Sequence, residues 1–191
     1  MSGLAGIILA AGTSSRFGAD NKLLFQYAGK AMVRHVAEAA LATELDPVIV
    51  VTGHDAQGVR AALRGLDLEY AHNAQFADGQ AGSLKTGIAA VPRQCAGAMV
   101  LLGDMPEVGA EIINQLLDAF TDETGIVVPV HNGARGNPVI LGCEHFAGLG
   151  KVSGDKGARD LLAGENVCTV DVASDAIVRD FDTPDSLQVP K

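Results

Sequence analysis

The sequence predicts an α/β protein, with a mainly parallel sheet covered by helices on both faces and an antiparallel element beside it. Short apolar runs alternate with segments of helical periodicity over residues 4–130, and parallel strands need such helical crossovers. After residue 130 the alternation ends, because Asn132 and Gly133 form a hairpin-type turn before the apolar run at residues 138–141. Hydrophobic residues make up 48% of the chain, which supplies the apolar side chains that a sheet buried on both faces requires.

The first strand is expected at residues 4–10, where a continuous apolar run ends in Gly12 and a loop continues to about residue 29. Further apolar runs predict buried strands at residues 47–51, 68–71, 98–102 and 126–130. Apolar residues at helical spacing predict the intervening helices, at residues 31–41, at residues 55–63 with Asp55 as the cap, from about Ser83 to residue 91, and at residues 112–120.

The C-terminal part of the chain is expected to be less regular. The sequence predicts a helix at residues 155–163, two short strands at residues 167–172 and 176–181, and a final helical turn that begins at Asp182. No stretch looks like a linker, and a chain of 191 residues is short for two domains. Residues 1–191 are therefore expected to form a single domain.

The charge and the apolar runs argue against several classes of protein. A formal net charge of −9 does not suit a general nucleic-acid surface, which needs a basic stripe. The apolar run at residues 4–11 is too short to span a bilayer and lacks the flanks of a signal peptide. We therefore expect no nucleic-acid partner, no membrane and a cytoplasmic location. No CxxC occurs among the cysteines, so a disulfide framework or zinc site is not indicated by Cys95, Cys143 and Cys168.

The segment at residues 9–22 has the composition of a triphosphate-binding loop. Small residues directly after a buried strand let backbone N–H groups approach a phosphate chain, and Arg16 and Lys22 add positive charge. It is not a Walker loop, since no Gly-Lys-Ser/Thr follows, and GxGxxG occurs nowhere in the chain. A Gly-rich turn alone is more often a tight connection, but the placement of Arg16 and Lys22 favours the phosphate-binding interpretation.

Asp104 follows the strand at residues 98–102, at the carboxyl edge where ligands bind in open α/β sheets. A carboxylate there suits Mg²⁺, which is commonly bound through one or two carboxylates and substrate phosphates. The alternative role is a cap for the helix that starts near Gly109. A second carboxylate is available at Asp180 or Asp182, which share one side of a strand; the alternative there is a strand end followed by a helix cap.

Six motifs together resemble the molybdenum-cofactor nucleotidyltransferases over nearly the whole chain. They are Leu-Ala-Ala-Gly-x-Ser-x-Arg-Phe-Gly-x-x-x-Lys at residues 9–22, Gly-Gln-Ala-x-Ser-Leu at 79–84, Gly-Asp-Met-Pro at 103–106, Arg-Gly-Asn-Pro-Val at 135–139, Gly-Asp-x-Gly-Ala-Arg at 154–159 and Asp-x-Asp-Thr-Pro at 180–184. Within that group the chain is most similar to the molybdopterin cytidylyltransferases. The guanylyl branch usually has Leu-Ala-Gly-Gly at the loop, where Ala11 stands here.

The resemblance implies a single-domain, Rossmann-like three-layer α/β/α nucleotidyltransferase fold and a set of site residues. Arg16 and Lys22 would contact phosphates, and Asp104 with Asp182 would bind Mg²⁺. The nucleotide would be lined by Leu9, Ala10, Ala11, Gly12, Asn73, Gly79 and Ser83. Residues 135–138 and 154–159 would receive the second substrate. The family often has another residue at the position of Asn137, which leaves open a different acceptor.

The implied reaction transfers CMP from CTP to the phosphate of molybdopterin, releases pyrophosphate and belongs to molybdenum-cofactor biosynthesis. The implied partners are CTP in preference to GTP, molybdopterin or a related phosphorylated acceptor, and a client molybdoenzyme. One alternative is a guanylyl- or sugar-phosphate nucleotidyltransferase. Another, from a different class, is a non-catalytic module that binds the cofactor precursor and delivers it.

Overall fold

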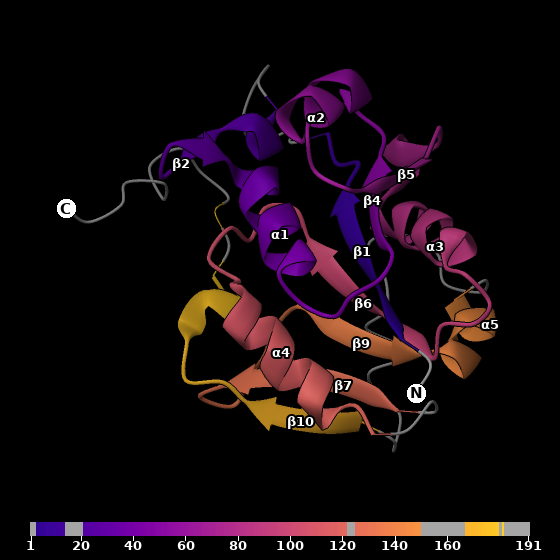
Figure 1. Ribbon diagram of the computed structural model, residues 1–191, viewed down its shortest axis with the longest axis vertical. Coiled ribbons are helices and arrows are strands. Elements are labelled where there is room, and N and C mark those ends of the chain that lie inside the picture. The colour runs from indigo at the N-terminus through magenta and orange to yellow at the C-terminus, as the bar shows by residue number, and fades with distance from the viewer. Residues whose placement is uncertain (1–2, 14–20, 122–124, 150–166, 180, 182–191) are drawn as a thin grey trace.

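In the computed structural model, the described residues are 3–13, 21–121, 125–149, 167–179 and 181. They form a mixed sheet in the order β10-β7-β9-β6-β1-β4-β5, with β8 paired to β7 (Figure 1). The strands are β1 (Leu4–Ala10), β4 (Val48–Thr52), β5 (Glu69–His72), β6 (Gly97–Leu102), β7 (Ile126–His131), β8 (Ala134–Arg135), β9 (Val139–Gly142) and β10 (Val167–Asp171), and a separate hairpin contains β2 (Gln26–Tyr27) and β3 (Lys30–Ala31).

Helices cover both faces of this sheet. The α-helices are α1 (Met32–Leu41), α2 (Ala56–Ala62), α3 (Gln80–Ala90), α4 (Ala110–Ala119) and α5 (Phe146–Leu149). Successive side chains of β1 point to opposite faces of the sheet. Ile8 packs in a hydrophobic cluster with residues of α1, α2 and α4, and Ile7 packs in another cluster with residues of α3 and α5. Figure 1 shows α1 and α4 in front of the sheet and α3 at its side. The expected three layers are confirmed.

The parallel part of the sheet follows the sequence prediction closely. Strand β1 pairs in parallel with β4 and β6, and β4 pairs in parallel with β5. The antiparallel element is also confirmed: Asn132 and Gly133 have positive φ angles of 49° and 80°, and they connect β7 to β8. Strand β9 lies within the sheet, between β6 and β7, and runs antiparallel to both.

Three predicted elements differ in the structure. The loop predicted to continue to about residue 29 contains the 3-10 helix η2 (Lys22–Leu24) and strand β2 (Gln26–Tyr27). Helix α3 begins at Gln80, three positions before the predicted start at Ser83, because Gly79 enters the helix with a φ of 105° that other residues rarely adopt. The strand predicted at residues 176–181 is replaced over its first residues by a 3-10 helix, η6 (Asp175–Ile177). There the Ser174 hydroxyl accepts a hydrogen bond from the Ala176 N–H at 3.2 Å, and Ala176 and Ile177 are buried.

The remaining predictions concern the cap of α2, the C-terminal helical segments and membrane-spanning helices. Asp55 caps α2 as expected, since its carboxylate accepts a hydrogen bond from the Gly58 N–H at 3.1 Å. The helix predicted at residues 155–163 and the turn from Asp182 lie outside the described residues. Over the part of the chain that the structure describes, no helix has both the length and the apolar character needed to cross a bilayer.

The close pairing of β6 with β9 makes a prediction about stability. A Cβ on Gly97 would lie 2.5 Å from the Leu141 carbonyl oxygen, whereas a Cβ on Gly3 would meet nothing within 4 Å. Because backbone must shift to relieve this clash, Gly97→Ala is expected to lower the free energy of unfolding by about 1–3 kcal/mol. Gly3→Ala, the control, should change it by less than about 0.5 kcal/mol. Urea unfolding measures both, and equal effects would contradict the β6–β9 pairing described here.

Candidate functional site

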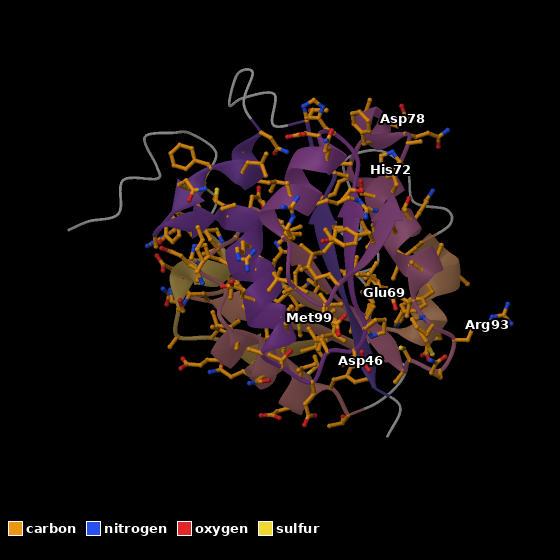
Figure 2. All side chains as sticks on the ribbon, turned by 45° about the horizontal axis from the view of Figure 1, so that its top comes forward. Asp46, Glu69, His72, Asp78, Arg93 and Met99 are labelled. Carbon is orange, nitrogen blue, oxygen red and sulfur yellow. The ribbon has the colours of Figure 1, made fainter. Side chains whose placement is uncertain are left out.

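The candidate site lies where the parallel strands end. Strands β1, β4, β5 and β6 run in the same direction, so their carboxyl ends meet at one edge of the sheet. This edge contains Gly12, Gly53, Asn73 and Asp104, each of which follows one of these strands. In Figure 2, His72 and Asp78 lie at this end of the molecule and Asp46 lies toward the other end.

A buried cation meets a carboxylate at this edge. Lys22 Nζ lies 3.0 Å from Asp104 Oδ2, and the two side chains are 7% and 30% exposed. Lys22 opens a short 3-10 helix, η2 (Lys22–Leu24), whose Leu23 N–H donates to the Asn21 side-chain oxygen at 3.1 Å. Because an ammonium group is costly to bury without a partner, Asp104 stabilises the buried position of Lys22. Two residues predicted from separate motifs are therefore in direct contact.

Gly103 allows the strand ends to approach so closely. Its N–H donates to the Leu9 carbonyl at 3.0 Å, and a Cβ on Gly103 would lie 3.0 Å from the same oxygen and 3.3 Å from Leu23 Cδ2. The alternative role of Asp104 as a helix cap is wrong, because the N-cap of α4 is Gly109 and no side chain caps it. Asp104 is thus directed to Lys22 at the sheet edge.

The end of β1 presents mainly backbone. Ala10 and Ala11 are 1% and 3% exposed, whereas Gly12 is exposed. The Ala11 carbonyl accepts a hydrogen bond from the His54 N–H at 3.2 Å. A Cβ on Gly53 would lie 2.8 Å from Ala11 Cβ and 2.5 Å from Phe76 Cβ, so the Ala11 methyl group is enclosed by its neighbours.

Asn73 and Ser83, both predicted to border the nucleotide, bond to each other. The Asn73 side-chain N–H donates to the Ser83 hydroxyl at 3.1 Å, and the Asn73 side-chain oxygen accepts from the Gln75 N–H at 3.0 Å. Both residues are 5% exposed. This contact fixes the end of β5 to the first turn of α3, directly after Gly79. The wall of the site is therefore held by a satisfied pair of buried polar groups.

Several predicted site residues cannot be placed. Arg16, Asp182 and residues 154–159 lie outside the described residues. Arg135 is exposed on β8, and the Asn137 N–H donates to the Ile177 carbonyl at 2.9 Å, so the segment at residues 135–138 adjoins η6. Its predicted contact with a second substrate stays a prediction.

Sequence reasoning missed Tyr27, Glu107 and Arg179. The Tyr27 hydroxyl donates to Glu107 Oε1 at 2.6 Å, and Arg179 Nη1 donates to Glu107 Oε2 at 2.8 Å. Burial raises the pKa of Tyr27 to about 12, and the hydrogen bond to Glu107 adds to the shift. These residues are far apart in the sequence and belong to none of the six motifs. Glu107 directly follows the Gly-Asp-Met-Pro motif, and this position is the signal that could have identified it as a candidate.

Asp104 has the chemistry of a ligand for a divalent cation. It offers a hard carboxylate oxygen donor at a partly exposed position, shortly after the end of β6. In the described ranges, no group of three or more His, Cys, Asp or Glu side chains gathers in a way that could hold a metal ion. Mg²⁺ is commonly bound through one or two carboxylates, with substrate oxygens as further ligands.

Comparisons with known proteins agree with this fold. The MobA-like NTP transferase domain family matches residues 6–170. The chain is 28% identical over 162 residues to the bifunctional protein GlmU of Francisella tularensis, an alignment that covers 83% of this chain and 34% of GlmU. The chain thus spans about a third of the length of the curated relatives that it matches.

Solved structures extend the likeness over nearly the whole chain. The crystal structure of Rv0371c from Mycobacterium tuberculosis superposes with a TM-score of 0.85 at 27% identity, covering 97% of this chain and 95% of that chain. Rv0371c in complex with manganese gives a TM-score of 0.78 at 26% identity, covering 96% and 95% of the two chains. Because the family matches most of the sequence and the fold agrees, this chain belongs to the MobA-like NTP transferase domain family.

Proposed function

We propose that this chain is a molybdopterin cytidylyltransferase, which transfers CMP from CTP to the phosphate of molybdopterin and releases pyrophosphate. Membership of the MobA-like NTP transferase domain family supports a nucleotidyltransferase. The observation that carries the proposal is the contact of Lys22 with Asp104 at the carboxyl edge of the sheet. The resemblance of the motifs to the cytidylyl group supports the choice of substrates. The expected place of action is the cytoplasm.

In the proposed reaction, a phosphate oxygen of the acceptor attacks the α-phosphorus of CTP and forms a new P–O bond. The bond from the α-phosphorus to the oxygen of the β-phosphate breaks, and pyrophosphate leaves with the electron pair. No general base is needed, because a phosphate monoester has a second pKa of about 6 and is largely dianionic at neutral pH. Catalysis therefore depends on positioning and on charge neutralisation.

Lys22 is suited to stabilise charge on the transferring phosphoryl group. Its ammonium is held in place by Asp104 and is shielded from water, so its field acts with little screening and little reorganisation. Arg16 is proposed to contact the departing pyrophosphate. Asp104 and Asp182 are proposed to hold Mg²⁺, which when bound would neutralise triphosphate charge; the manganese complex of Rv0371c supports a divalent ion.

The proposed preference for CTP depends on the surroundings of Ala11. Its methyl group is buried in the apolar cluster against which Phe76 packs, so we propose that it affects the base through the position of Phe76. The ring centroids of Phe76 and His54 lie 5.9 Å apart. Residues 79–83 are proposed to border the base and ribose. A steric difference of one methyl group supplies about 10- to 200-fold discrimination.

Two alternatives remain distinct from this proposal. A guanylyl- or sugar-phosphate nucleotidyltransferase would use the same residues with another base or acceptor. A non-catalytic module would bind molybdopterin and deliver it to a client molybdoenzyme. The buried pairing of Lys22 with Asp104 favours an enzyme, since simple carriage of a ligand does not require a preorganised cation at the sheet edge.

The test is pyrophosphate release with molybdopterin, Mg²⁺ and either CTP or GTP. We expect kcat/KM for CTP to exceed that for GTP by about 10- to 200-fold. Equal values, or a preference for GTP, would overturn the cytidylyl assignment. Binding of molybdopterin without pyrophosphate release from any nucleotide would support the delivery module instead.

The same assay tests Lys22. We expect Lys22→Ala to lower kcat by about 100- to 1000-fold while changing KM for CTP much less, because its interaction strengthens as charge develops in the transition state. Lys30→Ala is the matched control, since Lys30 lies on β3 with a side chain that is 50% exposed. A raised KM with an unchanged kcat would contradict the proposed role.

A further inference from the structure

A second polar cluster lies close to the candidate site in the sequence and joins three segments of the chain. The Glu107 cluster consists of Tyr27, Glu107, Asp175 and Arg179. Arg179 Nη1 donates to both Glu107 carboxylate oxygens, at 3.0 and 2.8 Å, and its Nη2 donates to Asp175 Oδ2 at 2.8 Å. Together with the bond from Tyr27, these contacts connect the β2–β3 hairpin, the turn after β6 and the segment after η6.

The cluster joins the same two segments that Lys22 and Asp104 join. Tyr27 lies five residues after Lys22, and Glu107 lies three residues after Asp104. The segment from η2 to β2 and the turn after β6 are thus connected twice, once by Lys22 with Asp104 and once by Tyr27 with Glu107. Two connections between the same pair of segments restrict their relative movement more than either does alone.

The turn between the two connections is short and hydrogen-bonded. The Met105 N–H donates to the Leu102 carbonyl at 3.2 Å, and the Val108 N–H donates to the Met105 carbonyl at 3.2 Å. Pro106 fixes one more φ angle within this turn. A change in the position of Glu107 is therefore transmitted to Asp104 by a stiff piece of backbone.

The Tyr27 side of the cluster is also held firmly. Its ring packs edge-on against His35 and Phe181, with centroids 5.7 and 5.4 Å apart. The His35 Nε2 lies 2.6 Å from the Tyr27 carbonyl oxygen, and Phe181 packs on the fully buried Met32. Glu107 therefore bonds to an anchored ring on one side and to Arg179 on the other.

We infer that Glu107 is a positioning residue that holds Asp104, and through it Lys22, in the geometry needed for phosphoryl transfer. The inference rests on the proposed function for its kinetic consequence, but its structural consequence can be measured without any substrate. Charge-assisted hydrogen bonds are stronger than neutral ones, so replacing the carboxylate by an amide weakens the cluster and keeps its shape. Displacement of about 1 Å at reacting groups is enough to cost about 100-fold in rate.

The cluster itself is checked by titration of Tyr27. Burial, and after it the hydrogen bond to Glu107, raises the pKa of Tyr27 from 10 to about 12, so the neutral phenol stabilises the fold below pH 10 and this stabilisation is lost as the pH rises toward 12. Ultraviolet titration should show a late-ionising phenol that Tyr27→Phe removes and Glu107→Gln shifts to lower pH. An unchanged late component in Glu107→Gln would contradict the bond to Glu107.

The positioning claim is tested with Glu107→Gln against Glu38→Gln. Glu38 is a matched control, because it pairs with Lys30 at 2.6 Å and Arg34 at 2.9 Å, as Glu107 pairs with Arg179, and its side chain is 31% exposed against 24% for Glu107. We expect Glu107→Gln to raise the acylation rate of Lys22 by an amine-reactive reagent about fivefold, since protection follows local opening. Glu38→Gln should leave that rate within about twofold of the parent chain.

Kinetics supply the second readout. Glu107→Gln should lower kcat by about tenfold with KM for CTP nearly unchanged, and its further effect on kcat in a Lys22→Ala background should be smaller, because only the part that acts on Asp104 itself then remains. Equal effects of Glu107→Gln and Glu38→Gln on Lys22 acylation would overturn the inference. So would a kcat loss of the same factor in the Lys22→Ala background.

If the parent chain has no activity, the proposed function fails and the acylation experiment still decides the inference. If Glu107→Gln does not fold, Tyr27→Phe, which keeps the Arg179 pair, is measured in its place.

Discussion

Burial of the Lys22 ammonium is the constraint on which the rest of the site depends. With 7% of its side chain exposed, Lys22 requires a carboxylate within contact distance, and Asp104 at 3.0 Å supplies it. That contact requires the ends of β1 and β6 to lie side by side, which their parallel register ensures. A residue without a Cβ at Gly103 favours it, because backbone and Leu23 leave little space there. The ion pair of Lys22 with Asp104 thus depends on the register of the sheet and on Gly103.

After the antiparallel strands, the chain returns to the turn that follows Asp104. Strand β9 enters between β6 and β7, and the segment after β10 bonds to the turn that follows Asp104 through Arg179 and Glu107. Phe181 then packs on Tyr27 and Met32. A segment from near the C-terminus therefore supports the contact of Lys22 with Asp104, which come from the first two thirds of the chain.

The parallel core could be predicted from the sequence because each strand is a short apolar run and each helix has an apolar face, which are local properties. The start of α3 and the form of residues 175–177 could not, because a positive φ at Gly79 and the burial of Ile177 depend on the backbone and on distant packing. At the site, Lys22, Asp104 and Ser83 were predicted from motifs and Asn73 from the family resemblance, and the structure places them in two contacting pairs. Glu107 was missed because its partners Tyr27 and Arg179 are 80 and 72 positions away.

The central claim is that the pairing of Lys22 with Asp104 serves catalysis and not the fold alone. The direct measurement compares Lys22→Met, Asp104→Asn and the double variant for both unfolding free energy and kcat. Each single variant should lower stability by about 1–3 kcal/mol, moderated by the partial exposure of Asp104, and the double variant should lose less than the sum, because no unpaired buried charge remains. All three should have lost turnover. A double variant that regains turnover together with stability would contradict the account, because the pair would then be only structural.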